Sequence, residues 1–392
     1  MRDVVIVSAC RTPVGAFGGA FVSLSALDLG VVAIEEAIKR AGITSQEVDE
    51  LILGNVLPAG LGQNPARQVC LKAGWPFDIG CITVNKVCGS GLKSVMLAAQ
   101  AIATGDADVA VAGGIESMNN APYLLMNQRY GYRMGDTKAV DSMVHDGLWD
   151  HINDFHMGMS AELCAEKYGV TREDQDQFAV DSYNKAAKSQ AEGRFEAQIV
   201  PVPVPQRKGD PKMIGKDEGI KESSLEVLSK LRPAFKKDGT VTAGNASTIN
   251  DGAAAVVLMA AETAKAKGIT PLVKILAQGA AGIDPKYVLA APINSIPKVA
   301  AKAGMAPKDI ALHELNEAFA SSSVSVQRVL DLDPAKINVF GGSISIGHPI
   351  GASGGRVLTT LIYAMKDTGA PNGMVSLCLG GGEAVSLLVE NI

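Results

Sequence analysis

An internal repeat constrains the fold of this chain more than any other feature. Residues 33–55 (AIEEAIKRAGITSQEVDELILGN) resemble residues 295–317 (SIPKVAAKAGMAPKDIALHELNE). In each copy, apolar residues at helical spacing are followed by a glycine, a short turn and an apolar, strand-like stretch. A chain that repeats such a unit is expected to fold into two similar halves.

The resemblance between the halves continues downstream. Residues 88–100 (CGSGLKSVMLAAQ) and 351–363 (GASGGRVLTTLIY) each predict a loop of small residues that enters an amphipathic helix. Apolar strands are predicted at 107–114 and 373–382. Because strands and helices alternate in both halves, the sequence predicts two α/β domains of like topology.

A segment of different composition, roughly residues 119–250, separates the two halves. Thr171 and Asp174 form a candidate capping box for a helix that runs to about Gly193. Residues 201–240 carry nine Lys or Arg against six Asp or Glu, a local charge of +3 (9 − 6). This excess is typical of a solvated loop or of a surface that binds an anionic ligand.

The composition argues against several functional classes. With 392 residues, 47% of them hydrophobic, the chain can form two or three well-packed domains. A net charge of −5 argues against nucleic acid as the main partner. We expect no membrane association, since no apolar stretch reaches the roughly 18 residues of a span, and we expect a cytoplasmic location. The six cysteines lack Cys-x-x-Cys spacing, which disfavours disulfides and a zinc site.

Cys88 is the first candidate for chemistry. It directly precedes a predicted helix, where unpaired backbone N–H groups and the helix dipole favour a thiolate. Gly89 and Gly91 leave room for a substrate to approach. Taken alone, a cysteine in a tight loop is more often structural, and we interpret Cys81 in that way.

His348 and Cys378 are two further candidates for chemistry, and they support a reactive role for Cys88. His348 lies among six glycines in residues 341–355, a poor setting for a core side chain. Neither phosphate-loop pattern, G-x-G-x-x-G or G-x-x-x-x-G-K-[ST], occurs there. Cys378 ends an apolar strand and precedes Gly380, Gly381 and Gly382, whose N–H groups could face an oxyanion. Two thiols and an imidazole suit carbon–carbon bond chemistry on a thioester.

His151, Asp154 and His156 are a weaker cluster. Their side chains could bind a metal, but their spacing matches no zinc signature. We therefore interpret them as a loop cluster and predict no metal site.

Four segments resemble the signature motifs of the thiolases: NKVCGSGL, HELNEAFA, GGSISIGHPIGASGG and LCLGGG. The resemblance covers nearly the whole chain and is closest to the short-chain acetyl-CoA acetyltransferases. It implies a thiolase fold of two βαβαβαββ halves related by pseudo-twofold symmetry, with an inserted loop domain. On this basis we expect an N-terminal half (1–118, completed by 251–271), a loop domain over the coenzyme A site (119–250) and a C-terminal half (272–392).

The resemblance also implies residue roles. Cys88 becomes acylated, His348 activates it, and Cys378 removes a proton from the α-carbon of the second substrate. Asn316 holds a water that polarises the thioester oxygen together with His348. The backbone N–H groups of Cys88 and Gly380 form a second oxyanion hole. Eight further positions match residues that line the coenzyme A channel: Leu148, His156, Met157, Phe235, Ala243, Ser247, Ala318 and Phe319.

The activity implied is that of an acetyl-CoA C-acetyltransferase, which condenses two acetyl-CoA molecules to acetoacetyl-CoA by a ping-pong mechanism. Acetyl-CoA and coenzyme A are then substrates, no prosthetic group is expected, and the protein is a homo-oligomer, a dimer or a tetramer. The first alternative is a degradative 3-ketoacyl-CoA thiolase of broad chain length. A decarboxylating ketoacyl synthase is disfavoured by Cys378, and a non-catalytic acyl-CoA carrier by the intact set of reactive residues.

Two segments depart from the family pattern. Glu383 and Ala384 follow the last glycine run, and Glu383 would raise the pKa of Cys378 if its carboxylate faced inward rather than solvent. The stretch VLAAP, residues 288–292, replaces a Met-Gly-Thr-Gly-Pro run near the acyl pocket. Both departures concern acyl-chain specificity rather than the class of reaction.

Overall fold

The computed structural model describes residues 1–392 and contains two halves built from the same elements. The first half contributes five strands and three helices: β1 (Val4–Arg11), β3 (Glu50–Gly54), β4 (Gly80–Val84), β5 (Val109–Ser117), β12 (Asn250–Ala260), α1 (Ala26–Ala41), α2 (Pro65–Lys72) and α3 (Ser90–Thr104). The second half contributes four strands and four helices: β13 (Val273–Gly282), β14 (Leu312–Leu315), β15 (Asn372–Leu379), β16 (Glu383–Asn391), α8 (Pro292–Lys302), α9 (Ala320–Leu330), α10 (Ser343–Ile346) and α11 (Ser353–Thr368).

The strand order shows the internal symmetry. The first half runs β4-β3-β5-β12-β1 and the second runs β13-β16-β15-β14, joined where β1 pairs with β13. In the first half, β3 and β5 are parallel, and the next two pairs along the sheet, β5 with β12 and β12 with β1, are antiparallel. In the second half, β14 and β15 are parallel, and β15 with β16 and β16 with β13 are antiparallel. Only β4 lacks a full counterpart, since a single bridge between His313 and Ile337 stands in its place. The predicted α/β fold of two like halves is confirmed.

The repeated segments occupy equivalent places. Gly42 and Gly304 follow α1 and α8 with φ of 69° and 70°, the left-handed region that glycine adopts without a steric penalty. A short 3₁₀ turn then leads into β3 in the first half and β14 in the second.

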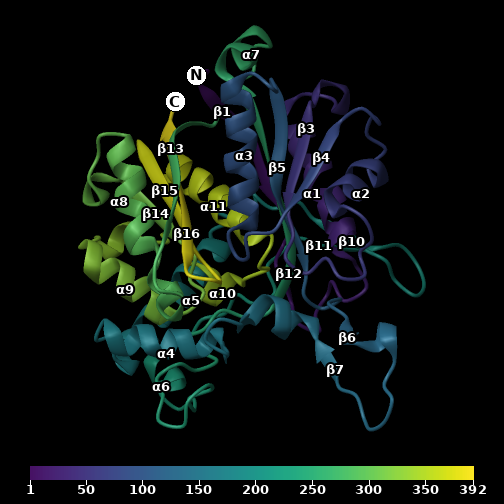
Figure 1. Ribbon diagram of the computed structural model, residues 1–392. Helices are drawn as coiled ribbons and strands as arrows, with labels where there is room; N and C mark the ends of the chain where they lie inside the picture. Colours follow the sequence, from purple (N-terminus) through teal and green to yellow (C-terminus); the bar gives the residue numbers. More distant parts are fainter.

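The helices form layers around the strands (Figure 1). α1 and α2 pack on the strands of the first half and α8 packs on those of the second, while α3 and α11 lie between the two sets. The largest apolar cluster contains residues of α3, of α11 and of strands from both halves. This central layer determines where the N-termini of α3 and α11 meet.

One expectation about membrane association needs correction. Residues 87–104, which include α3, are long and apolar enough for a membrane span by length and composition alone. In the fold, 56% of this segment is buried. Packing of α3 between the two sets of strands explains why it is so apolar.

Most of the insertion lies at one end of the molecule, below the strands in Figure 1, while residues 202–214 lie beside the first half. Its elements are β6 (Tyr123–Leu125), β7 (Ala139–Asp141), a π-helical turn (Met143–Leu148), β8 (Trp149–Asp150), β9 (Phe155–His156), α4 (Met157–Lys167), α5 (Arg172–Ala191), β10 (Val202–Val204), β11 (Lys212–Ile214) and α6 (Leu225–Leu228). The predicted capping box of Thr171 and Asp174 starts α5, which ends two residues before Gly193. β12 follows the insertion and lies between β1 and β5, so it completes the strands of the first half.

Candidate active site

A cavity of about 250 Å³ lies where the two halves and the insertion meet. Eleven of the predicted site residues line it: Cys88, His348, Cys378, Gly380, Leu148, His156, Met157, Phe235, Ser247, Ala318 and Phe319. Asn316 contacts His348 from behind the cavity wall. Ala243 is exposed and is not among the residues that line the cavity, so its predicted place beside coenzyme A stays a prediction.

A strained turn holds Cys88 at the start of α3. Val87, directly before it, has φ of 48°, which is unfavourable for a β-branched residue. The Ser90 hydroxyl donates to the Val87 carbonyl oxygen at 2.6 Å and accepts from the Lys86 N–H at 2.8 Å. A Cβ on Gly89 would lie 2.2 Å from Leu379 Cδ2, so glycine is needed for the approach of this turn to β15.

The electrostatics of Cys88 differ from the expectation of a thiolate. Burial raises the pKa of the thiol, and the nearby Cys378 and Glu116 raise it further. The backbone N–H groups of Cys88 and Gly380 hydrogen-bond to the sulfur and lower this pKa, but burial has the larger effect. The resting side chain is therefore a neutral thiol, with the two N–H groups directed at the sulfur.

The hydrogen bonds of His348 indicate its tautomer. Ser353 donates its hydroxyl to the Pro349 carbonyl oxygen at 2.9 Å, so His348 Nδ1, 2.5 Å from Ser353 Oγ, is the donor of that pair. Nε2 is then an acceptor and lies 3.4 Å from Asn316 Nδ2. Burial lowers the pKa of His348 to about 3, and the charge of Arg356 contributes in the same direction. The imidazole is thus neutral, with an unprotonated Nε2.

Cys378 is the penultimate residue of β15 and is 2% exposed. Burial raises the pKa of its thiol to about 11, while a hydrogen bond with Ser322 lowers it. Glu383 does not face this thiol: its side chain is 48% exposed and pairs with Lys86 Nζ at 2.5 Å. Of the two alternatives for Glu383, the structure has the solvent-facing one.

Aromatic rings from the insertion form one wall of the cavity. His156 stacks on Phe235 with centroids 4.8 Å apart, and Phe235 meets Phe319 edge-on at 6.2 Å. A Cβ on Gly158 would lie 2.3 Å from the Phe235 ring, so glycine allows this packing. The wall is apolar and suits the pantetheine arm of a coenzyme A thioester better than a charged group.

The weaker candidates have ordinary hydrogen-bond partners. His151 Nε2 contacts the His145 carbonyl oxygen at 2.8 Å, and Asp154 accepts from Trp149 Nε1 at 3.1 Å. No group of three or more metal-binding side chains gathers anywhere in the chain.

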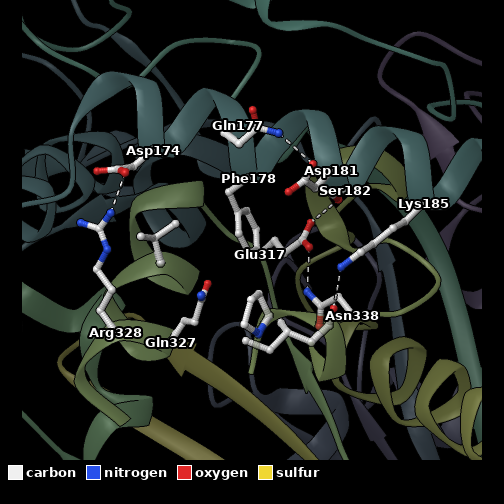
Figure 2. A pocket seen from close by; sticks show the side chains of 13 residues that line it. Asp174, Gln177, Phe178, Asp181, Ser182, Lys185, Glu317, Gln327, Arg328 and Asn338 are labelled. Carbon is white, nitrogen blue, oxygen red and sulfur yellow. Dashed lines mark hydrogen bonds and ion pairs between the residues drawn. The ribbon is translucent and has the colours of Figure 1, made fainter. Parts of the chain in front are cut away.

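A second cavity, of about 220 Å³, lies between α5 and α9 (Figure 2). Its lining is mostly polar and includes the buried Glu317 carboxylate, next to Asn316 in sequence. Ser182 and Asn338 both donate to this carboxylate at 2.7 Å.

Sequence reasoning missed residues that support the site. Ser353 and Ser343 contact His348 and Asn316, and Glu116 accepts the Gly351 N–H in the loop that carries His348. Arg356 could have been noticed in the sequence, because it is the single charged residue of residues 351–363, a predicted helical segment of otherwise small and uncharged residues. No comparable pattern marks the serines.

Comparisons with known proteins agree with this geometry. The family pattern described as "Thiolase, N-terminal domain" matches residues 4–262, and "Thiolase, C-terminal domain" matches residues 269–391. The chain belongs to the thiolase family.

This thiolase resembles named relatives over its full length. It is 53% identical to an acetyl-CoA acetyltransferase of Cupriavidus necator, with both chains fully covered. It is 52% identical to a probable acetyl-CoA acyltransferase of Staphylococcus aureus, covering 100% of this chain and 99% of the relative. A crystal structure of the Bacillus anthracis acetyl-CoA acetyltransferase superposes with a TM-score of 0.98 at 41% identity, covering 100% of this chain and 99% of that one. The expected thiolase fold is confirmed.

Proposed function

We propose that this thiolase is an acetyl-CoA C-acetyltransferase that catalyses the reversible condensation of two acetyl-CoA molecules to acetoacetyl-CoA and coenzyme A. One observation carries this proposal. Cys88, Cys378 and His348 line a single cavity, with two backbone N–H groups directed at the Cys88 sulfur. Thioester exchange and carbon–carbon bond formation need a nucleophile, a base and oxyanion donors at one place.

In the first half-reaction, His348 Nε2 takes the proton of Cys88 as the sulfur attacks the acetyl-CoA carbonyl. Because burial raises the pKa of this thiol and lowers that of His348, proton transfer accompanies attack rather than preceding it. The tetrahedral intermediate collapses, and the leaving coenzyme A thiolate takes the proton of Cys378. Acetyl-Cys88, protonated His348 and the Cys378 thiolate remain.

In the second half-reaction, the Cys378 thiolate takes a proton from the methyl group of a second acetyl-CoA. A water on Asn316, together with His348, stabilises the enolate oxygen. The enolate carbon attacks acetyl-Cys88, whose oxyanion faces the N–H groups of Cys88 and Gly380. Acetoacetyl-CoA departs, and His348 returns its proton to the Cys88 sulfur, which closes a ping-pong cycle with all protons accounted for.

Coenzyme A is proposed to lie along the apolar wall formed by the insertion, residues 119–250, which acts as a loop domain. Leu148, His156, Met157 and Phe235 from this segment support the assignment, since all four line the cavity. Its phosphates are then within the basic stretch of residues 201–240, where lysine and arginine exceed acidic residues. The proposal involves no prosthetic group, because every proton and acyl transfer has a protein residue to perform it.

The alternative is a 3-ketoacyl-CoA thiolase of broad chain length. The Staphylococcus aureus relative is named an acyltransferase, a term that is not restricted to the acetyl group. Val288 and Leu289, from the stretch that departs from the family pattern, line the cavity and limit space near Cys378. Their bulk favours short acyl groups.

We further propose a cytoplasmic homo-oligomer, a dimer or a tetramer. All six cysteines are free, which fits a reducing compartment. β4 is an edge strand that pairs only with β3, and its Ile82 is 45% exposed. A free strand edge of this kind favours pairing with a second copy. The hairpin of β6 and β7 exposes several large apolar side chains: Tyr123, Leu125, Met126, Tyr130 and Met134.

Thiolysis of 3-ketoacyl-CoA substrates by coenzyme A tests the proposed function. We expect the highest kcat/KM with acetoacetyl-CoA and a steep decline at ten to sixteen acyl carbons. A preference for the long chains would support the alternative, and no turnover on any of these substrates would overturn both.

A further inference from the structure

A directed chain of hydrogen bonds passes through the candidate active site. Arg356 Nη2 donates to Ser343 Oγ, and the Ser343 hydroxyl donates to Asn316 Oδ1 at 2.6 Å. Asn316 Nδ2 faces His348 Nε2 at 3.4 Å, and the chain ends through Ser353 at the Pro349 carbonyl. Each group donates to the next, from a cation at one end to a carbonyl oxygen at the other.

Arg356 is an unusual residue to begin such a chain. It is 1% exposed, and its Nε and Nη1 atoms have no hydrogen-bond partner. The carboxylate of Glu314 lies 3.6 Å from Nη1, beyond hydrogen-bond distance. A buried guanidinium normally satisfies most of its five donors. Beside the buried ion pair with Glu314, the bond to Ser343 is the hydrogen bond that this guanidinium makes.

The orientation of the Asn316 amide depends on Ser343. In the reverse orientation, Ser343 Oγ would face two donors, Arg356 Nη2 and Asn316 Nδ2, and its own proton would lose its acceptor. Asn316 Oδ1 would then face His348 Nε2, which is itself an acceptor in the tautomer set by Ser353. Both ends of the chain therefore select the orientation in which the amide nitrogen points toward His348.

The backbone around Asn316 is held by other groups. Its N–H donates to the Ser376 carbonyl oxygen at 3.0 Å. Asn338 brackets Leu315, accepting from its N–H at 2.7 Å and donating to its carbonyl oxygen at 2.9 Å. On the other side, Glu317 is anchored in the second cavity by Ser182 and Asn338, as Figure 2 shows. The loss of Ser343 would thus free the Asn316 side chain without releasing its backbone.

We propose that Ser343 and Arg356 are positioning residues for the reaction at this site, which hold the Asn316 amide nitrogen toward His348 and the bound water. The inference rests on the proposed function, in which Asn316 and His348 polarise the thioester oxygen. Ser343 touches neither substrate nor reacting atoms and acts through Asn316.

A double-mutant cycle tests the proposal. Ser343→Ala is expected to lower kcat for acetoacetyl-CoA thiolysis about tenfold, the effect of one lost hydrogen bond to a transition-state group, with KM for coenzyme A unchanged. In the Asn316→Ala background the same change is expected to have no further effect. Ser343→Thr keeps the hydroxyl and should restore most of kcat. Independent, multiplicative losses from Ser343→Ala and Asn316→Ala would overturn the proposal.

Ser345 provides the matched control, because it lies on the same short helix α10 and its hydroxyl binds Gly342 and Ser182 instead of Asn316. Ser345→Ala should leave kcat within twofold of wild type, and an equal loss in both variants would indicate a general disturbance of α10 and overturn the positioning role.

A readout without turnover separates this inference from the proposed function. In wild type, the ¹⁵N shifts of the His348 ring should report a protonated Nδ1 and an unprotonated Nε2 that accepts a hydrogen bond from the Asn316 amide. Ser343→Ala should leave Nδ1 protonated, because Ser353 still holds the tautomer, and should move the Nε2 shift toward that of an unprotonated nitrogen without a hydrogen bond. If wild type fails to cleave acetoacetyl-CoA, the proposed function fails, and the ring shifts still decide whether Ser343 sets the orientation. Unchanged shifts in Ser343→Ala would overturn the inference, whatever the activity.

Discussion

Glu116 of β5 accepts the backbone N–H of Gly351, in the loop after His348, at 2.8 Å. The same buried carboxylate accepts the N–H groups of Val56 and Leu57 and the side-chain amide of Asn55. It therefore connects the first half of the chain to the loop that carries the active-site imidazole.

Replacing Glu116 with Gln should destabilise the protein by about 2 kcal/mol, since an amide NH₂ would face two donors in either orientation. In one orientation these are the N–H groups of Val56 and Gly351, and in the other the Leu57 N–H and the Asn55 side-chain amide. The measurement is the free energy of unfolding in urea. Glu262→Gln serves as the control, because Glu262 is exposed and binds only Arg2 among side chains. Equal stability of the two variants would contradict the connecting role of Glu116.

Because Cys88 is a neutral thiol at pH 7, we expect its alkylation rate to depend on pH in a specific way. Burial raises the pKa of this thiol, so its reaction with iodoacetamide, followed from about pH 5 to pH 10, should accelerate continuously up to pH 10. Imidazole ionisation should leave no inflection near pH 6.5, since the pKa of His348 is lowered to about 3. Comparison with Cys88→Ser identifies the labelling that belongs to this cysteine. A plateau already reached at pH 7 would show a thiolate and contradict the account.

Because His313 is buried, we expect the folded protein to lose stability in acid. Burial lowers its pKa from 6.5 to about 4, so the unfolded chain binds this proton more readily than the folded one. The stability that neutral His313 contributes is complete above pH 6.5 and is lost as the pH falls toward 4, at about 1.4 kcal/mol for each pH unit. His313→Gln, whose amide can still donate to the Pro307 carbonyl oxygen, should show a shallower decline in urea unfolding. Parallel declines in the two proteins would refute this.

We expect Val288, which lines the cavity, to limit the length of the acyl chain that the enzyme accepts. Val288→Ala removes two methyl groups from the lining, and the ratio of kcat/KM for the six-carbon over the four-carbon 3-ketoacyl-CoA should rise about tenfold. Val299→Ala is the control, since it makes a buried change on α8 away from this cavity. If both variants keep the wild-type ratio, Val288 does not limit chain length.

The sequence predicted much of the fold and of the site for a physical reason. Gly42 and Gly304 end equivalent helices and mark equivalent halves, because only the left-handed region lets a helix turn so sharply into a strand. Cys88 and Cys378 each stand beside glycines at the end of a regular element, and these positions converge when the central helices pack together.

Other features depend on contacts that a linear pattern does not contain. The neutral state of Cys88 follows from burial by distant segments, which outweighs the local effect of the helix N-terminus. Glu383 faces solvent because Lys86, far away in sequence, is there to pair with it. The role of Ser343 becomes visible only once Arg356 and Asn316 are on either side of its hydroxyl.

The central claim is the division of labour between Cys88 and Cys378, and mass spectrometry combined with α-proton exchange tests it most directly. After incubation with acetyl-CoA, wild type and Cys378→Ser should carry an acetyl group on the peptide that contains Cys88, while Cys88→Ser should carry none. In D₂O, only proteins that retain Cys378 should exchange the methyl protons of acetyl-CoA. Acetylation of Cys378, or exchange that persists in Cys378→Ser, would contradict the account.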